Sequence, residues 1–133
     1  DALDDVSDDE LDRPAPDDGW TARWVAHHVA ESETSAFVRL RRLIAEDAPA
    51  IVGSDEGLYA RRSHYHRPIG SALAVVEAVR ASSLELLESL SDEEWQRAGT
   101  HTETGRYSVD DWLRIYAAHP HDHADQVRRA LGR

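Results

Sequence analysis

Residues 109–131 read VDDWLRIYAAHPHDHADQVRRAL, and this stretch decides the fold. Its apolar and histidine positions recur every three or four residues, the spacing of one face of an α-helix. Ser108 with Asp111 resembles a capping box at the start, and Gly132 is a typical stop. We therefore predict a helix from Val109 to about Leu131. Its inward face carries Val109, Trp112, Tyr116, His119, His123, Val127 and Ala130.

Two more long helices are predicted upstream, over residues 21–47 and 68–90. Thr21 suits the N-cap of the first, and Pro68 suits the first turn of the second. The segment SDEEW at 91–95 predicts a short helical turn with its own cap. Residues 50–67 and 98–107 contain glycines and many polar residues, and they read as loops, the former with room for a short helical turn. No segment alternates with period two, so we predict an all-α fold without a sheet.

The whole chain, residues 1–133, is expected to form one domain. Residues 1–19 read as the end of a helix followed by an acidic loop that Pro14, Pro16 and Gly19 interrupt. Residues 20–133 then form the bundle. The sequence contains no Met, so we expect most of a first helix to precede Asp1.

Composition narrows the classes of function. The net charge is −11, and nine acidic residues against one arginine lie within residues 1–18, so a nucleic-acid partner is not expected. No apolar run approaches the roughly 20 residues that cross a bilayer, and the acidic start is unlike a signal peptide. We therefore expect no membrane partner and a cytoplasmic protein. Cysteine is absent, so a metal would need nitrogen or oxygen ligands.

The inward histidines indicate a metal site. His119 and His123 are four residues apart on one helix face, where leucine or isoleucine is usual, so both imidazoles can reach one ion. A third ligand must come from another helix. In residues 21–47, His28 lies near the stripe of Val25, Ser32 and Ala36, whereas His27 points to roughly the opposite side. We predict that His28, His119 and His123 hold one divalent ion, and that His27 is exposed or supports a ligand.

Other interpretations of the polar residues stay open. A histidine on an apolar face is more often a core residue with one hydrogen bond than a ligand. His64 and His66 lie in a loop, His101 is better suited to capping, and His121 points away from the stripe.

Two residues interrupt the predicted helices. Pro120 removes one helical hydrogen bond and frees the carbonyl of Tyr116, so a kink there could re-aim His119. Arg80 interrupts an apolar face. It either pairs with a carboxylate inside the bundle, which is the more frequent case, or meets an anionic group of a substrate.

Four segments together resemble the DinB-like family. They are WTARWVAHHVAESE at 20–33, SDEEW at 91–95, HTETGRYSVDDWL at 101–113 and AHPHDHADQV at 118–127. The resemblance spans Trp20 to the C-terminus and implies a four-helix bundle with three histidines on a divalent metal. Its ligand positions match His28, His119 and His123. It also implies a first helix before Trp20, cut short here, and frequent dimers; Pro120 departs from the family pattern.

The resemblance implies one fold but several activities. Characterised members include transferases and isomerases that use low-molecular-weight thiols such as bacillithiol or mycothiol, and others are named as metal-dependent hydrolases. We expect a small-molecule substrate and a metal-dependent transferase that activates such a thiol. A hydrolase that uses metal-bound water is the alternative, and so is a non-catalytic, metal-stabilised binding module. Zinc, nickel, iron and manganese all suit three histidines. No catalytic side chain is assigned.

Overall fold

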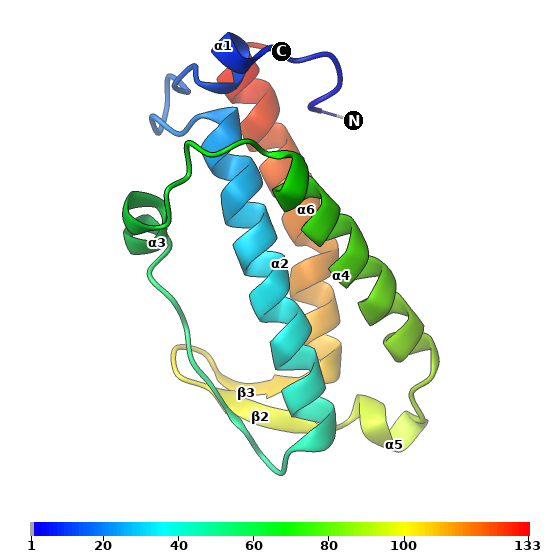
Figure 1. Cartoon of the computed structure of the whole chain (residues 1–133). Helices are drawn as coiled ribbons and strands as arrows, with labels where there is room; N and C mark the ends of the chain where they lie inside the picture. The colour runs from blue at the N-terminus through cyan, green and yellow to red at the C-terminus, as the bar shows by residue number, and fades with distance from the viewer. Residues whose placement is uncertain (1) are drawn as a thin grey trace.

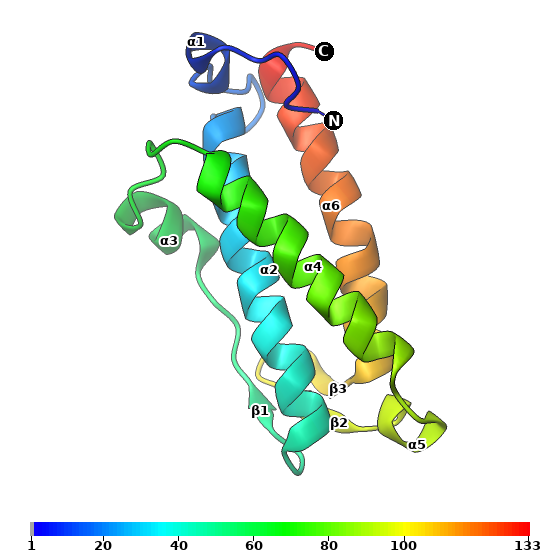
Figure 2. The same ribbon diagram turned by 45° about the vertical axis from the view of Figure 1, so that its right-hand side comes forward.

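Three long helices carry the fold in the computed structural model, which describes residues 2–133. They are α2 (Ala22–Ala45), α4 (Gly70–Glu88) and α6 (Val109–Leu131). Helix α2 packs against both α4 and α6 (Figures 1 and 2). The bounds of α6 are those predicted, and the other two agree within three residues. Helix α2 therefore forms the middle of the bundle and presents one face to each neighbour.

Caps and core explain where these helices begin and how they pack. The Thr21 hydroxyl accepts from the Trp24 N–H at 3.1 Å, and Ser108 and Asp111 form the predicted capping box of α6. One core cluster lies between α2, α6 and the strands. It consists of Ala36, Leu40, Leu43, Ile51, Tyr107, Val109, Trp112 and Tyr116. The Trp112 indole N–H donates to the carbonyl of Ala36 at 2.8 Å. Each large buried side chain contributes about 1.5–3 kcal/mol through burial.

A small sheet corrects the prediction that the chain contains none. Strands β1 (Ala50–Ile51), β2 (Ala98–His101) and β3 (Gly105–Ser108) lie in this order, with β1 parallel to β2 and β2 antiparallel to β3. Strands of two to four residues are too short to show a period of two. Gly99 is needed here, because a Cβ would lie 2.2 Å from the carbonyl oxygen of Pro49. Backbone approach, not side-chain pattern, determines this sheet.

Two short helices occupy connecting segments. Helix α3 (Glu56–Arg62) lies in the segment predicted as a loop with a helical turn, with the Asp55 side chain capping Leu58 N. Helix α5 (Asp92–Trp95) is the predicted turn at SDEEW, with a complete capping box between Ser91 and Glu94. The prediction of short helical turns in these two segments is confirmed.

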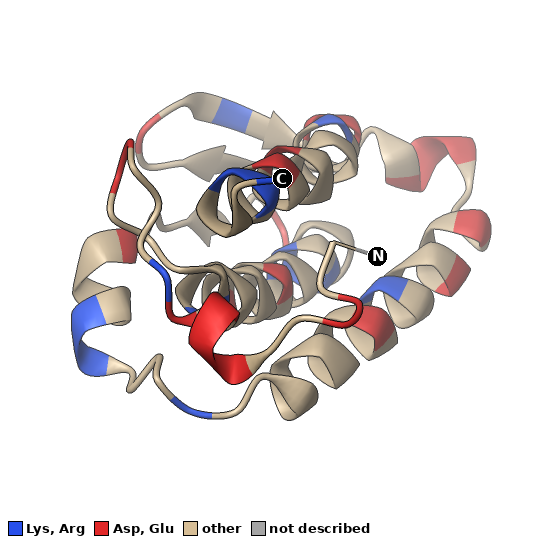
Figure 3. Ribbon diagram, turned by 90° about the horizontal axis from the view of Figure 1, so that it is seen from above, with Lys and Arg blue, Asp and Glu red and all other residues tan. Residues whose placement is uncertain are grey.

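The acidic N-terminal segment folds against the end of α6. Asp1 lies outside the described residues. The segment contains α1 (Asp8–Leu11), a single turn that begins at its own cap, Ser7, rather than the tail of a longer helix. Asp8 and Asp12 both pair with the buried Arg23 of α2, at 2.9 and 2.6 Å. Figure 3 shows this acidic turn close to the C-terminus of the chain. Part of the acidity thus has a structural role that composition does not reveal.

Across residues 2–133, none of the helices combines the length and the apolar character that crossing a membrane requires.

Candidate metal centre

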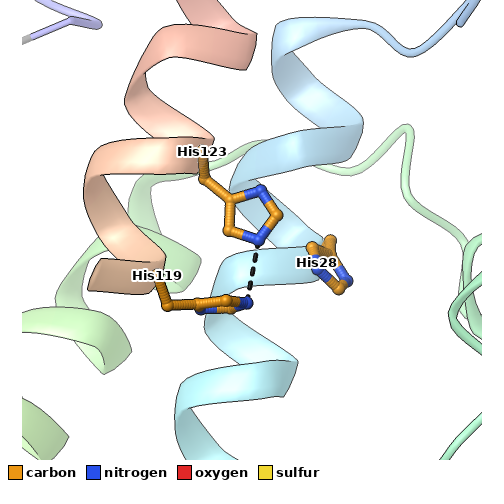
Figure 4. A group of neighbouring side chains, drawn as sticks. All are labelled: His28, His119 and His123. Atoms are coloured by element: carbon orange, nitrogen blue, oxygen red, sulfur yellow. Dashed lines mark hydrogen bonds between the residues drawn. The ribbon is translucent and has the colours of Figure 1, made fainter. Parts of the chain in front are cut away.

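The three predicted ligands meet between α2 and α6. His28 projects from α2, and His119 and His123 project from α6, one turn apart (Figure 4). One ring nitrogen from each of the three lies within 4.8 Å of the other two. The Nε2 atoms of His119 and His123 are 2.9 Å apart. The structure therefore brings together the set chosen from helical faces, and its donors are the nitrogen ligands that transition metals prefer.

The buried nitrogens of the cluster show whether a metal ion would fit it. The Nε2 of His28 and the Nδ1 of His119 are buried and have no hydrogen-bond partner. Leaving such a group unsatisfied costs about 1–3 kcal/mol. A cation at the centre would accept the lone pair of the His28 Nε2 and those of the two facing Nε2 atoms. The residues present thus fit a divalent metal ion.

His123 is oriented by a chain of hydrogen bonds from outside the cluster. Its Nδ1 lies 3.0 Å from Oε1 of Gln126, so this nitrogen donates and the Nε2 keeps its lone pair. The Gln126 amide in turn donates to Oδ2 of Asp18 at 2.9 Å. Partners of this kind fix the tautomer and the ring plane of a metal ligand.

His119 has a different support, built around Glu33. The carboxylate of Glu33 is 4% exposed and lies 3.8 Å from Nδ1 of His119. Arg80 of α4 binds both Glu33 oxygens, at 3.1 and 2.8 Å. Burial raises the pKa of Glu33, but His119 and Arg80 outweigh it and hold the pKa below its usual value. An ionised carboxylate behind His119 favours a proton on Nδ1 and leaves Nε2 free.

Arg80 also compensates for the hydrogen bond that Pro120 removes from α6. Proline has no N–H, so the Tyr116 carbonyl four residues earlier lacks its helical donor. The Arg80 guanidinium donates to this carbonyl at 2.6 Å. The expectation that Arg80 pairs with a carboxylate inside the bundle is confirmed, and Glu33 is its partner. Arg80 thereby compensates for Pro120 within α6 and supports His119 through Glu33.

Burial favours the neutral imidazole of two ligands, His28 and His123. Burial lowers the pKa of His28; Glu56 raises it in part, and His123 and His119 lower it further. Burial also lowers the pKa of His123, against an opposing contribution from Gln126. Neutral imidazole is the form that binds metals.

A pH dependence of the metal-free protein follows from these two shifts. A histidine whose pKa is lower in the folded state takes up fewer protons there than in the unfolded chain. The folded state therefore loses stability as the pH drops below 6.5, the ordinary pKa of histidine. We expect the thermal midpoint of chelator-treated protein to fall between pH 7.5 and about 5, and to fall less in His28→Gln. Equal slopes for the two proteins would contradict this. Thermal denaturation followed by circular dichroism measures it.

The remaining histidines lie outside the cluster. His27 was predicted to be exposed or to support a ligand, and the first alternative is wrong, because His27 is buried. Its Nε2 lies 2.9 Å from the Arg67 carbonyl, and its ring stacks on Tyr65. His121 is exposed on α6, and His64 and His66 contact each other in an exposed turn. The Nδ1 of His101 accepts from the Glu103 N–H, a local turn contact of the kind expected.

A cavity of about 310 Å³ opens onto the cluster, with His28 and His119 in its wall. Three further groups in the wall are Glu31, Arg39 and Glu56. Glu56, from the first turn of α3, places an oxygen 3.8 Å from Nε2 of His28. Glu31 accepts a 2.6 Å hydrogen bond from the Tyr65 hydroxyl. An ion among the histidines would thus face a polar chamber that can admit a small molecule.

Sequence analysis missed the supporting residues Glu33, Gln126 and Glu56. Glu33 had a usable signal, because it lies four residues after Val29 and three before Ala36, on the buried side of α2. Gln126 lies three residues after His123, within reach of the same helix face. Glu56 had no signal, since a helix of seven residues after a loop carries no register relative to α2.

Comparisons with known proteins show which family and which relatives the chain resembles. A family model described as the DinB superfamily matches residues 1–127. The protein OB0782 of Oceanobacillus iheyensis, provisionally named a metal-dependent hydrolase, is 35% identical over 123 residues, which are 92% of this chain and 72% of that protein. YfiT of Bacillus subtilis carries the same provisional name and is 32% identical over 129 residues, covering 95% of this chain and 72% of YfiT.

The solved structure of Bacillus subtilis YfiT supports the fold directly. It superposes with a TM-score of 0.88 at 28% identity, over 98% of this chain and 78% of that one. That structure is described as a four-helix bundle of unusual topology, and its function is again given provisionally as metal-dependent hydrolysis. The predicted bundle fold is confirmed, with the three-stranded sheet as a minor addition.

Proposed function

Because the chain belongs to the DinB superfamily, we propose that it is a metal-dependent transferase that joins a low-molecular-weight thiol cosubstrate to an electrophile: the thiol loses its proton and its sulfur forms a new bond to the electrophile, which releases its leaving group where it has one. The cosubstrate is of the bacillithiol or mycothiol type. One observation carries the metal dependence: one ring nitrogen from each of three histidines lies close to the other two beside a polar cavity, and the buried Nε2 of His28 is unpartnered. The choice of a thiol as cosubstrate rests on the family resemblance.

The donor set favours a catalytic over a structural ion. Structural zinc sites are closed by four protein ligands, whereas three protein ligands leave a position for water or substrate. A divalent ion in such a site lowers the pKa of a bound water or thiol, which supplies a nucleophile at neutral pH. We propose one ion per chain, with zinc, nickel, iron and manganese as candidates.

The protein's own groups have separable roles in this proposal. His28, His119 and His123 hold the ion. Glu33, held by Arg80, orients His119, and Gln126 orients His123. The cavity binds the small molecule against these groups and limits the access of water. We also propose a homodimer in the cytoplasm, which size-exclusion chromatography with light scattering and cell fractionation would test.

Hydrolysis by metal-bound water is the second candidate. The provisional names of OB0782 and YfiT favour it. So does Glu56, a carboxylate 3.8 Å from His28, at a place from which it can accept a proton from water in the cavity.

A thiol-dependence assay separates the candidates. We expect the metal-loaded protein to consume electrophiles such as 1-chloro-2,4-dinitrobenzene or N-ethylmaleimide faster than the thiol alone does, and to consume none when the thiol is omitted. Chromatography of the reaction measures loss of electrophile and gain of adduct, with His119→Ala as control. Thiol-independent turnover of an ester panel would instead support hydrolysis. Metal that raises the thermal midpoint without any turnover would support a binding module.

A further inference from the structure

We propose that Arg39 binds a carboxylate of the substrate at the end of the cavity farther from His28, so that the cavity accepts an elongated acidic thiol. The thiol rests on the proposed function; the carboxylate does not. Arg39 lies on α2 eleven residues after His28, about 16 Å further along the helix axis. Long side chains on a helix lean back towards its N-terminus, which brings the guanidinium nearer to the histidines. Both residues line the same cavity.

Arg39 has no counter-ion among the residues that the structure describes. Its Nη1 donates to the Tyr116 hydroxyl at 3.1 Å and its Nη2 to the Val52 carbonyl at 2.7 Å, and both acceptors are neutral. Within residues 2–133 no carboxylate oxygen lies within ion-pair distance of it. Arginines that do have such a partner include Arg23, Arg42, Arg80, Arg97, Arg114, Arg128, Arg129 and Arg133. A half-buried guanidinium held in place by neutral groups presents its remaining N–H donors to an anion.

Of the two tyrosine hydroxyls next to Arg39, that of Tyr116 can add a donor to the cavity. The Tyr116 hydroxyl accepts from Arg39, so its own proton remains available to a ligand. Tyr116 is one turn before His119 on α6, with the two rings 5.7 Å apart, and it lines the cavity. The Tyr107 hydroxyl is buried without a hydrogen-bond partner. Burial raises the pKa of Tyr107, so this hydroxyl keeps its proton, but it lies in the core beside Arg39 and not in the cavity wall.

The cavity wall also carries negative charge, from the carboxylates of Glu56 and Glu31. Glu56 lies beside His28, and Glu31 is bound by Tyr65. A ligand with one anionic end is therefore repelled from these positions and attracted to Arg39. Glu103 is exposed, lines the cavity and packs against Gly53, the neighbour of Val52, so its charge opposes an anion at Arg39.

A matched ligand series tests the subsite. Calorimetry would compare 3-mercaptopropionate, 6-mercaptohexanoate and 8-mercaptooctanoate with the mercapto alcohols of equal length, on zinc-loaded and on metal-free protein. We expect at least one acid to bind about tenfold or more tightly than its alcohol. In Arg39→Gln this ratio should fall to about one, while the alcohol binds as before. Arg106→Gln removes one exposed positive charge outside the cavity and should leave the ratio unchanged.

A structural role for Arg39 predicts a different outcome. If it only held Val52 to α2, Arg39→Gln would weaken acid and alcohol equally, and the ratio would persist. Arg39→Lys, which keeps the charge, should retain part of the ratio, and Glu103→Gln should preserve or increase it. No preference for any acid, or a preference that survives in Arg39→Gln, overturns the proposal.

The same series separates this proposal from the proposed function. An acid preference in metal-free protein, without thiol turnover by the loaded protein, would support the subsite and contradict the thiol transferase. Thiol turnover without any acid preference would support the thiol transferase and contradict the subsite.

Discussion

Replacing His119 by alanine is expected to abolish stoichiometric metal binding. Wild-type protein should hold about one divalent ion per chain, because one ring nitrogen from each of three histidines lies within 4.8 Å of the other two. Removal of a residue that only hydrogen-bonds a ligand lowers metal affinity roughly 10- to 100-fold. Removal of one of three ligands should lower the affinity by more than this. Metal content after gel filtration against a competing chelator, measured by plasma mass spectrometry, gives the result.

His121 provides the matched control for this experiment. It is an exposed histidine on the same helix, two residues from each ligand, and it does not belong to the cluster. His121→Ala should retain the wild-type metal content. Full occupancy in His119→Ala, or equal losses in both variants, would contradict the assignment of His119.

Replacing Arg80 by leucine is expected to have the largest effect on stability among the residues around the site. It leaves the carboxylate of Glu33, 4% exposed, without its cationic partner, and the Tyr116 carbonyl without its donor. Breaking a buried pair costs about 3–5 kcal/mol. Since the Arg80 side chain is 37% exposed, solvent screening brings this to about 2–3 kcal/mol. Urea unfolding measures the loss, and a chelator competition should show about 10- to 100-fold weaker metal binding.

Arg114→Leu is the corresponding control. Arg114 pairs with Asp110 on the surface of α6, and its side chain is 72% exposed. The variant should lose about 0–1 kcal/mol, as is usual for a surface pair, and should keep its metal affinity. If Arg80→Leu behaves like Arg114→Leu in both measurements, then Arg80 and Glu33 do not support the site.

The helices and the three histidines were predictable because both depend on the same periodicity. The positions from Val109 to Ala130 fix the inward face of α6, and this face carries His119 and His123 without further assumption. The same rotation of about 100° per residue separates His28 from His27 on α2. The caps at Thr21 and Ser108 depend on residues only three apart, so they can be recognised from a single sequence. Identification of the ligands as a metal site still drew much of its strength from the family resemblance.

The rest depends on contacts between distant segments. The sheet pairs residues 50–51 with 100–101 and then with the adjoining strand, and strands this short have no pattern of their own. Exposure was one of the two alternatives for His27, because it points away from the inward stripe of α2. The connection from α3 to α4 covers it through Arg67, and the sequence does not reveal where this connection lies. Arg39 carried no sequence signal, since only the cavity shows that its charge lacks a partner.

Anomalous X-ray diffraction from crystals of the metal-loaded protein tests the central claim most directly. Data collected above and below the absorption edge of the bound metal should give one peak per chain, enclosed by the ring nitrogens of His28, His119 and His123, with an open side towards the cavity. A peak at another position, or none among these histidines in protein that elemental analysis shows to be loaded, would contradict the account.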